Sequence, residues 1–564
     1  MNEPDQLWNR RDPSSATPAG SGSATGGSPG TGSVPLNVSP AGGEAGATWS
    51  PAGILVVGAL LLGVVLLPVF LCRYFPSHNG PALLSITHLA KHLHDPGLGY
   101  DRYYEERLYP VPYLAQHALQ WVLLDLVEDR HVPRLVTVVA VLLRFWAAWY
   151  WLGGVGGRDV RRRWLCWLII PWALEFVLLR GYVNFHLGTS LALVVYGWYL
   201  RFRDRWSPWS LVAWNLLTLA TYFCHAVPVA LAGLLVAVDD TVRTGRPQRV
   251  PLLALRGFLP VLILLAAFVL HSRANSGWGA NEWVTTSPVE KLRAVKSRLG
   301  TPLSTMVRLG GLGLLALPLV LRLGERRLTP GPGPAAATPR GERWAVPAAC
   351  LTMGLIYLAC PNSLLGWHKA DLHLLPLVPL LWLGATPLPA GGWRLAMIPL
   401  AAALLGLAGM APIGRALAEG SAEVEEYLAG LEAVPPRQTL LSLVGEGPEG
   451  LDRQVFEPTQ WADSYYLIRR GGGLGRSLVK HNTIYPVWFR DFREGGQRQF
   501  PPVDAQDPTG EQLERAAEVY GAAVLWDISP DVAERLEQVG FEPRFQQGRL
   551  RVLVNRRVQE PGRD

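Results

Sequence analysis

The sequence predicts a polytopic α-helical membrane protein with about 11 transmembrane helices and a C-terminal extracytoplasmic α/β domain. Apolar runs of about twenty residues, the length that a helix needs to cross the hydrocarbon core, recur from Ala52 to Ala411. Charged residues make up only 17% of the chain, against roughly 25% in soluble domains. Polar segments precede and follow the apolar runs. These observations exclude an ordinary soluble enzyme.

The first 50 residues are rich in Gly, Ser, Pro, Ala and Thr and carry almost no aliphatic bulk. Such a segment cannot bury enough apolar surface to fold, so we expect a disordered cytoplasmic tail over residues 1–50. The first apolar run, Ala52 to Cys72, is too long for the core of a signal peptide and follows no basic segment. We expect it to remain as a membrane anchor.

Residues 51–411 are predicted to form the transmembrane domain. The candidate spans are 52–72, 133–153, 164–180, 183–201, 208–223, 224–238, 251–271, 302–323, 344–360, 371–386 and 393–411. Residues 109–127 are also apolar but contain two Gln, one His and one Asp. If this segment does not cross, the Arg-rich loops all fall on one side, which is then cytoplasmic. We therefore expect an interfacial or re-entrant helix there, a cytoplasmic N-terminus and an extracytoplasmic C-terminus.

Three regions then face the extracytoplasmic side: a first loop over 73–130, a second loop over 272–300, and residues 412–564. The last region is predicted to be an α/β domain. Its β-like runs are 439–444 and 522–526, its helical segments are 510–520 and 530–539, and its closing hairpin joins 541–545 to 550–554. All five cysteines lie in or beside apolar runs, so no disulfide framework stabilises this domain.

The net charge of +7 raises the question of a polyanionic partner. Lys and Arg are concentrated in short loops between the apolar runs, where they encode the orientation of the chain in the membrane. We therefore expect contact with membrane lipid and no nucleic-acid partner.

Polar side chains at the ends of apolar runs supply candidate substrate-binding residues, because such groups are costly in a membrane and often mark function. On the predicted topology they lie near the extracytoplasmic face. They are Asn184, His186, His225, His368, Lys369 and Arg180. Lys369, His368 and Arg180 are the nearest cations for a phosphate. Each residue alone could instead be a helix-end group bonded to a neighbour.

The first loop holds the candidates for acid–base chemistry. Asp101 and Glu105 are carboxylates placed where a general base could meet an extracytoplasmic acceptor, and His78 is a third catalytic candidate. Gly and Tyr residues around Asp101 suggest a shaped loop. The alternative is that these carboxylates are only solvated.

A metal site is the one cofactor that the loop suggests. His88 and His92 are four residues apart on one helix face and, together with Asp95, could hold a divalent metal such as Mg or Mn. The alternative is the wet face of an amphipathic interfacial helix, which needs no metal.

This layout resembles the GT-C glycosyltransferases, which include protein O-mannosyltransferases and aminoarabinose transferases. Residues 75–81 (FPSHNGP), 181–188 (GYVNFHLG) and 222–225 (YFCH) are similar to segments of bacterial membrane proteins of that superfamily. The resemblance implies inverting transfer of a sugar from a polyprenyl-phosphate donor. It also implies a cell-envelope glycan, lipid or protein acceptor, and a multi-pass location in the bacterial plasma (inner) membrane.

One position departs from the GT-C pattern. An acidic residue, the base, is expected just after the first span, and this chain has Asn79 there. Asn79 then becomes a substrate-binding candidate, and Asp101 or another loop carboxylate takes the role of base. Two alternatives stay open: a transporter or flippase for a lipid-linked sugar, and a non-catalytic membrane scaffold.

Overall fold

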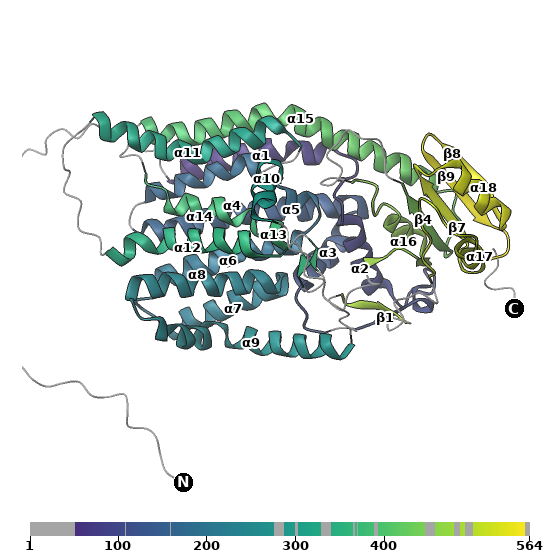
Figure 1. The fold of residues 1–564 in the computed structure, drawn as a ribbon, viewed down its shortest axis with the longest axis horizontal. Helices are drawn as coiled ribbons and strands as arrows, with labels where there is room; N and C mark the ends of the chain where they lie inside the picture. Colours follow the sequence, from purple (N-terminus) through teal and green to yellow (C-terminus); the bar gives the residue numbers. More distant parts are fainter. Residues whose placement is uncertain are drawn as a thin grey trace, which may run out of the picture. The chain divides into compact units, whose positions relative to one another are not determined.

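A computed structural model describes residues 51–107, 109–157, 160–275, 287–298, 303–328, 340–361, 363–364, 367–368, 370–388, 393–445, 457–478, 485–490 and 500–558. The predicted tail over residues 1–50 and much of the predicted loop 272–300 lie outside the described residues. The chain is mainly helical, with a five-stranded sheet near the C-terminus (Figure 1).

Long helices pack side by side into one bundle. They are α1 (Pro51–Leu71), α4 (Val132–Gly156), α6 (Val183–Phe202), α7 (Pro208–Cys224), α8 (Ala226–Thr244), α9 (Val250–Asn275), α11 (Thr305–Leu328), α12 (Arg340–Ala359) and α15 (Trp393–Leu431). Helix α4 packs against α6, which also contacts α7 and α8, and α8 packs against α12. Helix α15 lies along α1 and α11 (Figure 1).

Local sequence signals set the ends of these helices. Ser207 begins α7 with a capping box, in which the Ser207 and Ser210 side chains each bond the other's backbone N–H. Gly245 ends α8 in the left-handed conformation that glycine adopts readily. Each predicted span falls on one or two described helices, which confirms the helical class.

By length and composition, three described helical stretches could cross a membrane: Asp129–Gly156, Pro247–His271 and Leu395–Leu431. Shorter apolar helices cover Val56–Leu71, Thr305–Leu321, Arg343–Ala359 and Asp371–Ala385. The predicted span over 371–386 is divided at Pro376 into α13 (Ala370–Leu374) and α14 (Leu377–Ala385). The count of about 11 spans therefore stays a prediction.

The predicted span over 164–180 is not one α-helix. The chain forms a 3-10 helix, η3 (Val160–Trp172), and then a short helix, α5 (Phe176–Leu179). Pro171 lacks a backbone N–H, so a regular helix is not favoured through it. Glu175 precedes α5 in an extended conformation.

The arginine-rich loops meet at one end of the bundle. Arg201, near the end of α6, donates to the backbone carbonyl of Tyr150 in α4. Arg162 in η3 donates to the carbonyl of Gly384 in α14. Gly341 in α12 packs against the last turn of α8. This arrangement agrees with the one-sided distribution of arginine on which the predicted topology rests.

The first loop contains two short helices, α2 (Gly80–His92) and α3 (Leu114–Leu126), each of 13 residues. At 1.5 Å per residue each is about 20 Å long, too short for a hydrocarbon core of about 30 Å. The two helices pack together, and Lys91 of α2 pairs with Asp125 of α3. The short α3 agrees with the interfacial helix predicted over 109–127.

The C-terminal sheet has the strand order β5-β4-β7-β9-β8. Its strands are β4 (Thr439–Val444), β5 (Gly473–Leu474), β7 (Ala522–Trp526), β8 (Phe541–Gln547) and β9 (Leu550–Asn555). β4 is parallel to β5 and β7, and β9 is antiparallel to β7 and β8. The helices are α16 (Ser464–Arg470), α17 (Gly510–Val519) and α18 (Pro530–Gln538). The strands, helices and closing hairpin predicted in this region are confirmed, whereas the two-residue β5 was not predicted.

The bundle and the sheet are joined through α15. This helix of 39 residues runs without a break across the predicted domain boundary between residues 411 and 412. Its C-terminal part packs against β7, β8 and β9, and Gly430 lies against Leu550. The first loop adds a second connection, because β1 (Tyr104–Glu106) pairs with β6 (Val487–Phe489).

The remaining described elements are short. They are α10 (Pro288–Arg298), β2 (Ser363–Leu364), β3 (Trp367–His368), η1 (Tyr100–Arg102), η2 (Asp129–His131) and η4 (Pro247–Arg249).

Candidate functional site

The start of the first loop is held against the turn between α5 and α6. The His78 N–H donates to the Leu179 carbonyl (3.0 Å), and the Asn79 N–H donates to the Arg180 carbonyl (3.2 Å). Gly181, in that turn, has a φ of +77°, and a Cβ there would lie 2.9 Å from the Asn79 nitrogen. Only glycine adopts this positive φ without strain, and only a residue without a Cβ lets the Asn79 nitrogen come so close. The sequence segments 75–81 and 181–188 therefore touch each other.

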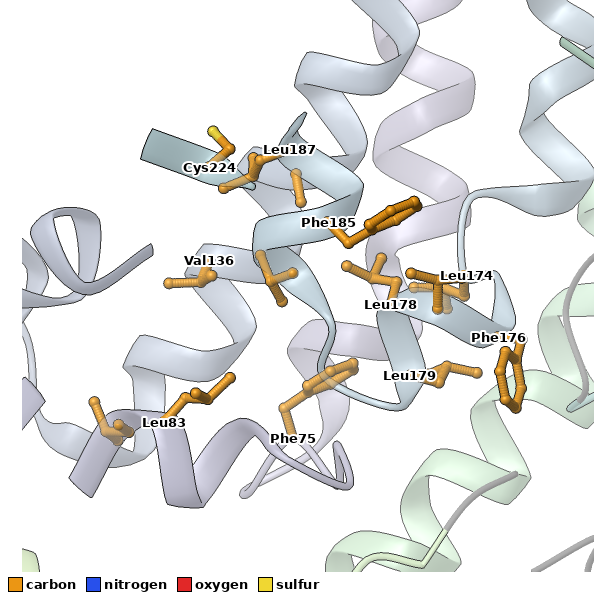
Figure 2. Close-up of a cluster of buried hydrophobic side chains, with 14 of the residues drawn as sticks. Phe75, Leu83, Val136, Leu174, Phe176, Leu178, Leu179, Phe185, Leu187 and Cys224 are labelled. Carbon is orange, nitrogen blue, oxygen red and sulfur yellow. The ribbon is translucent and has the colours of Figure 1, made fainter. Parts of the chain in front are cut away.

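A cluster of buried apolar side chains adjoins this contact in the sequence and includes Phe75 and Leu179 (Figure 2). Its side chains come from the first loop and from α4, α5, α6 and α7, and they include Phe75, Leu83, Leu178, Leu179, Phe185 and Leu187. Every one of these side chains is buried. The packing of these buried side chains holds the polar residues of the first loop and of the α5–α6 turn in place.

His78 lies between a cation and a carboxylate. Its Nδ1 is 3.4 Å from Glu457 Oε2 and 3.4 Å from Arg180 Nη1. One ring nitrogen cannot donate to a carboxylate and accept from a guanidinium at once, so the two contacts are alternatives. When Nδ1–H faces Glu457, Nε2 carries the lone pair, which is the arrangement of a base oriented by a carboxylate. We call these three residues the His78 group.

His225 caps the N-terminus of α8 and has a defined tautomer. Its Nδ1 accepts from the Val227 N–H (3.1 Å), so in the neutral ring the proton is on Nε2. Nε2 lies 2.6 Å from the Tyr113 hydroxyl oxygen, which is therefore the acceptor. The Tyr113 hydroxyl hydrogen is left to point at a different acceptor.

Rings from α6, from Tyr182 just before it and from α13 lie around His225. Phe185 of α6 packs edge-on against His225, with centroids 5.1 Å apart, and stacks on His373 of α13 at 4.8 Å. The Tyr182 ring is 4.5 Å from that of His373. We call Tyr113, Tyr182, His225 and His373 the His225 group.

Several buried polar atoms in this region have no hydrogen-bond partner among the described residues. They are Gln116 Oε1, His117 Nε2, Arg180 Nε, Asn184 Nδ2 and His373 Nε2. Asn184 Oδ1 accepts from the Gln116 N–H (3.0 Å), which links α6 to α3. An unsatisfied buried polar group costs about 1–3 kcal/mol. Such atoms need a partner, which a bound water or a ligand can supply, so this region is a candidate binding site.

His186 belongs to a separate charged group inside the bundle. Its Nδ1 is 2.6 Å from Glu175 Oε1, and Arg144 Nη2 is 3.6 Å from the same oxygen. Arg144 Nε also donates to the Ser190 hydroxyl (2.8 Å). All four side chains are buried. This contact set joins α4, α6 and the η3–α5 turn, so it is sufficient to explain His186 without a substrate.

The predicted carboxylate candidates lie on the C-terminal side of the first loop. Asp101 is exposed on η1, and its backbone carbonyl accepts from Arg490 (2.6 Å). Glu105, on β1, pairs with Arg107 (2.8 Å). Among the described residues, no hydrogen bond or ion pair joins either carboxylate to the two groups defined above. Their catalytic role stays a prediction.

The predicted metal ligands are only partly brought together. The rings of His88 and His92 lie with centroids 4.4 Å apart, while Asp95 bonds the Gly97 N–H. His88 Nδ1 lies 3.1 Å from the Tyr100 hydroxyl. Burial, followed by the nearby His92, lowers the pKa of His88 to about 4. No group of three metal-ligating side chains occurs within the described ranges.

Two further predicted residues cannot be placed. Lys369 lies outside the described residues, and His368 is described only by its backbone, which pairs with Ser363 in the β2–β3 hairpin. Asn79 precedes α2 without a side-chain capping bond.

Sequence reasoning missed Glu457, Tyr113 and His373. His373 could have been found, since it is an ionisable residue inside the predicted span 371–386. Glu457 carried no local signal, because it meets His78 only through the tertiary fold.

An apolar groove of about 390 Å³ opens beside the His225 group. It runs between α8 and α9 and begins at Tyr222 and Ala226, the neighbours of His225. Its α8 wall includes four small residues at helical spacing, Ala226, Ala230, Gly233 and Ala237, beside Val229, Leu234 and Val236. A flexible hydrocarbon chain would fit such a groove.

No protein-family model and no curated protein matches the sequence. The crystal structure of ArnT from Cupriavidus metallidurans in the apo state is similar, with a TM-score of 0.56 and 12% identity over 89% of this chain and 98% of that chain. Arabinofuranosyltransferase AftD from Mycobacteria gives a TM-score of 0.45 and 17% identity over 88% of this chain and 41% of that chain. The likeness to ArnT shows that the two chains share a fold, as the sequence resemblance led us to expect.

Proposed function

We propose that this chain is a membrane glycosyltransferase that moves a sugar from a polyprenyl-phosphate donor to an acceptor at the membrane face next to the C-terminal sheet. The observation that supports this most directly is the apolar groove between α8 and α9, whose lining includes Ala226, the residue that follows His225. A lipid tail in the groove would bring its phosphate and sugar to the unsatisfied polar atoms.

The phosphate needs donors, and the sequence around the first turn of α6 supplies them. Arg180 Nε and Asn184 Nδ2 are buried donors without a partner among the described residues. A phosphate oxygen or a sugar hydroxyl would satisfy both, and a guanidinium–phosphate bond is charge-assisted. The donors would also stabilise the negative charge that the phosphate gains as it leaves.

The transfer step needs a base for the acceptor hydroxyl. His78, oriented by Glu457, would take the hydroxyl proton on Nε2. The acceptor oxygen then bonds the anomeric carbon from the side opposite the phosphate, the bond from carbon to phosphate oxygen breaks, and polyprenyl phosphate leaves with the electron pair. The product has the inverted anomeric configuration. Asp101 and Glu105 are the alternative bases.

The test uses the full chain in nanodiscs with a panel of radiolabelled polyprenyl-phosphate pentoses and hexoses. We expect transfer with at least one donor, and we expect His78→Ala to lower turnover by about 10²–10⁴ while donor binding is kept. His94→Ala is the matched control, because His94 is an exposed histidine of the same loop. Asp101→Asn should change turnover by less than about twofold.

Other outcomes would replace parts of the proposal. A large loss in Asp101→Asn with none in His78→Ala would move the base to Asp101. Movement of labelled donor between leaflets without transfer would make the protein a transporter. If no donor binds, the scaffold hypothesis holds instead.

A further inference from the structure

The C-terminal sheet carries a cavity of its own, of about 470 Å³. It is lined by the carboxyl-terminal half of β4 and by residues 475–478, which follow β5. Cavities of 300–1,000 Å³ with apolar walls and a few polar groups are typical of small-ligand sites. The carboxyl ends of parallel strands are also where open α/β sheets bind ligands.

The edge of β4 offers backbone groups to this cavity. The Gly473 N–H donates to the Gln438 carbonyl (3.2 Å), and the Gly475 N–H donates to the Leu440 carbonyl (3.1 Å). The even-numbered residues of β4 thus direct their backbone groups toward β5. Because β5 ends at Leu474, the N–H and carbonyl of Ser442 continue this series on the side of the cavity.

Charged and aromatic side chains complete the walls. The Arg476 guanidinium lies over the Trp461 ring, 4.8 Å from its centroid, and both residues line the cavity. The buried Trp461 Nε1 has no hydrogen-bond partner among the described residues. Tyr520, fixed by its bond to the Pro501 carbonyl (2.9 Å), forms the opposite wall.

A buried carboxylate lies next to these groups. Asp463 is 1% exposed, and neither carboxylate oxygen makes a hydrogen bond of good geometry with a described residue. Burial raises the pKa of Asp463 to about 6, although the nearby Arg476 and Ser442 oppose this shift. Its neighbours Trp461, Ser442 and Arg476 all line the cavity.

We propose that the cavity beside β4 binds a neutral oligosaccharide. Sugar hydroxyls both donate and accept, so they can pair with the backbone N–H and carbonyl of Ser442 and with Arg476, both of which line the cavity. The carboxylate of Asp463 next to Arg476 disfavours an anionic ligand. Only Ser442 and Val444 of the even-numbered β4 residues lie beyond the pairing with β5, a stretch too short to hold a peptide strand securely.

This binding site does not depend on the proposed transferase activity. If both hold, the cavity would retain the glycan acceptor near the membrane. Binding is measured without a lipid donor, so failure of the transfer assay and failure of the binding assay are distinguishable.

The test is calorimetry on the full chain in nanodiscs, with hexasaccharides of arabinose, mannose and glucose as probes. A uronic-acid hexasaccharide and a Gly-Ser hexapeptide serve as the charged and peptide comparisons. We expect at least one neutral hexasaccharide to bind saturably at millimolar concentration, and Arg476→Ala to weaken it by about tenfold or more. Arg544→Ala, an exposed change on β8 at the other edge of the sheet, should leave binding unchanged.

Folding of the variants is checked by hydrogen exchange in β4 and β7. Arg476→Lys, which keeps the charge and loses the planar contact with Trp461, should give intermediate affinity. The proposal is overturned if no neutral probe binds, if Arg476→Ala binds as well as the parent protein while folded, or if the uronate or the peptide binds best.

Discussion

At the scale of single residues, the candidate site is a set of side chains that no short motif contains. Polar residues at the ends of apolar runs pointed to Arg180, Asn184 and His225, because such residues are unusual at the edge of a membrane. The structure brings them together around the first turn of α6. Glu457 could not be predicted, since its contact with His78 depends on the packing of the C-terminal region onto the first loop.

Gly181 gives a residue-scale prediction. Gly181→Ala should lower stability by about 1–2 kcal/mol from its positive φ alone, and further because the new Cβ would lie 2.9 Å from the Asn79 and Gly80 nitrogens. The contact between the first loop and α6 should loosen, with loss of transfer activity. Thermal melting in detergent measures the stability change.

Gly245→Ala is the matched control. Gly245 also has a positive φ, of +66°, but nothing lies within 4 Å of its added Cβ. Gly245→Ala should therefore lower stability only through backbone strain. Equal losses of stability in Gly181→Ala and Gly245→Ala would show that the close contact of Gly181 with the first loop does not add to the effect of backbone strain.

At the scale of elements, α8 combines two features. Its first residue follows His225, and its small-residue face lines the apolar groove. The start of α8 was nearly predicted from the sequence, with the break placed at Cys224 and His225, whereas the predicted end at residue 238 lies before the observed end at Thr244. The position of the groove was not predicted, because it depends on how α9 packs against α8. The periodicity of apolar residues within one helix does not show which other helix packs against it.

Filling the groove gives an element-scale prediction. Ala230→Phe places a ring against the proposed path of the lipid tail, so the dissociation constant for a radiolabelled polyprenyl phosphate should rise by about tenfold. Leu216→Phe on α7, where Leu216 is 61% exposed, is the control and should leave the constant unchanged. An unaltered constant in Ala230→Phe would exclude this groove as the lipid site.

At the scale of the whole molecule, the distribution of arginine and the polar site define two ends of the bundle. Arg201 and Arg162 lie among the loops at one end, and the His78 group lies at the other. Counting the charges in the loops predicted that the arginine-rich loops share one end of the bundle. This prediction was possible because the loop charges can be read directly from the sequence. The continuous α15 was not predicted, since its composition changes at residue 411 while its helix does not end.

Membrane orientation gives the whole-molecule prediction. Glu534→Cys, on α18, should react with a membrane-impermeant maleimide in intact cells, because the C-terminal region is predicted to be extracytoplasmic. Arg205→Cys, in the loop after α6, should react only after permeabilisation. The parent protein is the control, since three of its five cysteines are buried and the other two are partly buried. The reverse pattern would invert the topology.

The pairing of β1 with β6 also has a consequence for biosynthesis. Tyr104 pairs with Phe489, so this wall of the first loop forms only after the ribosome has made most of the chain. Contacts so distant in sequence form late, after the local helices. A nascent or truncated chain can therefore have its helices inserted in the membrane and still lack the pairing of β1 with β6.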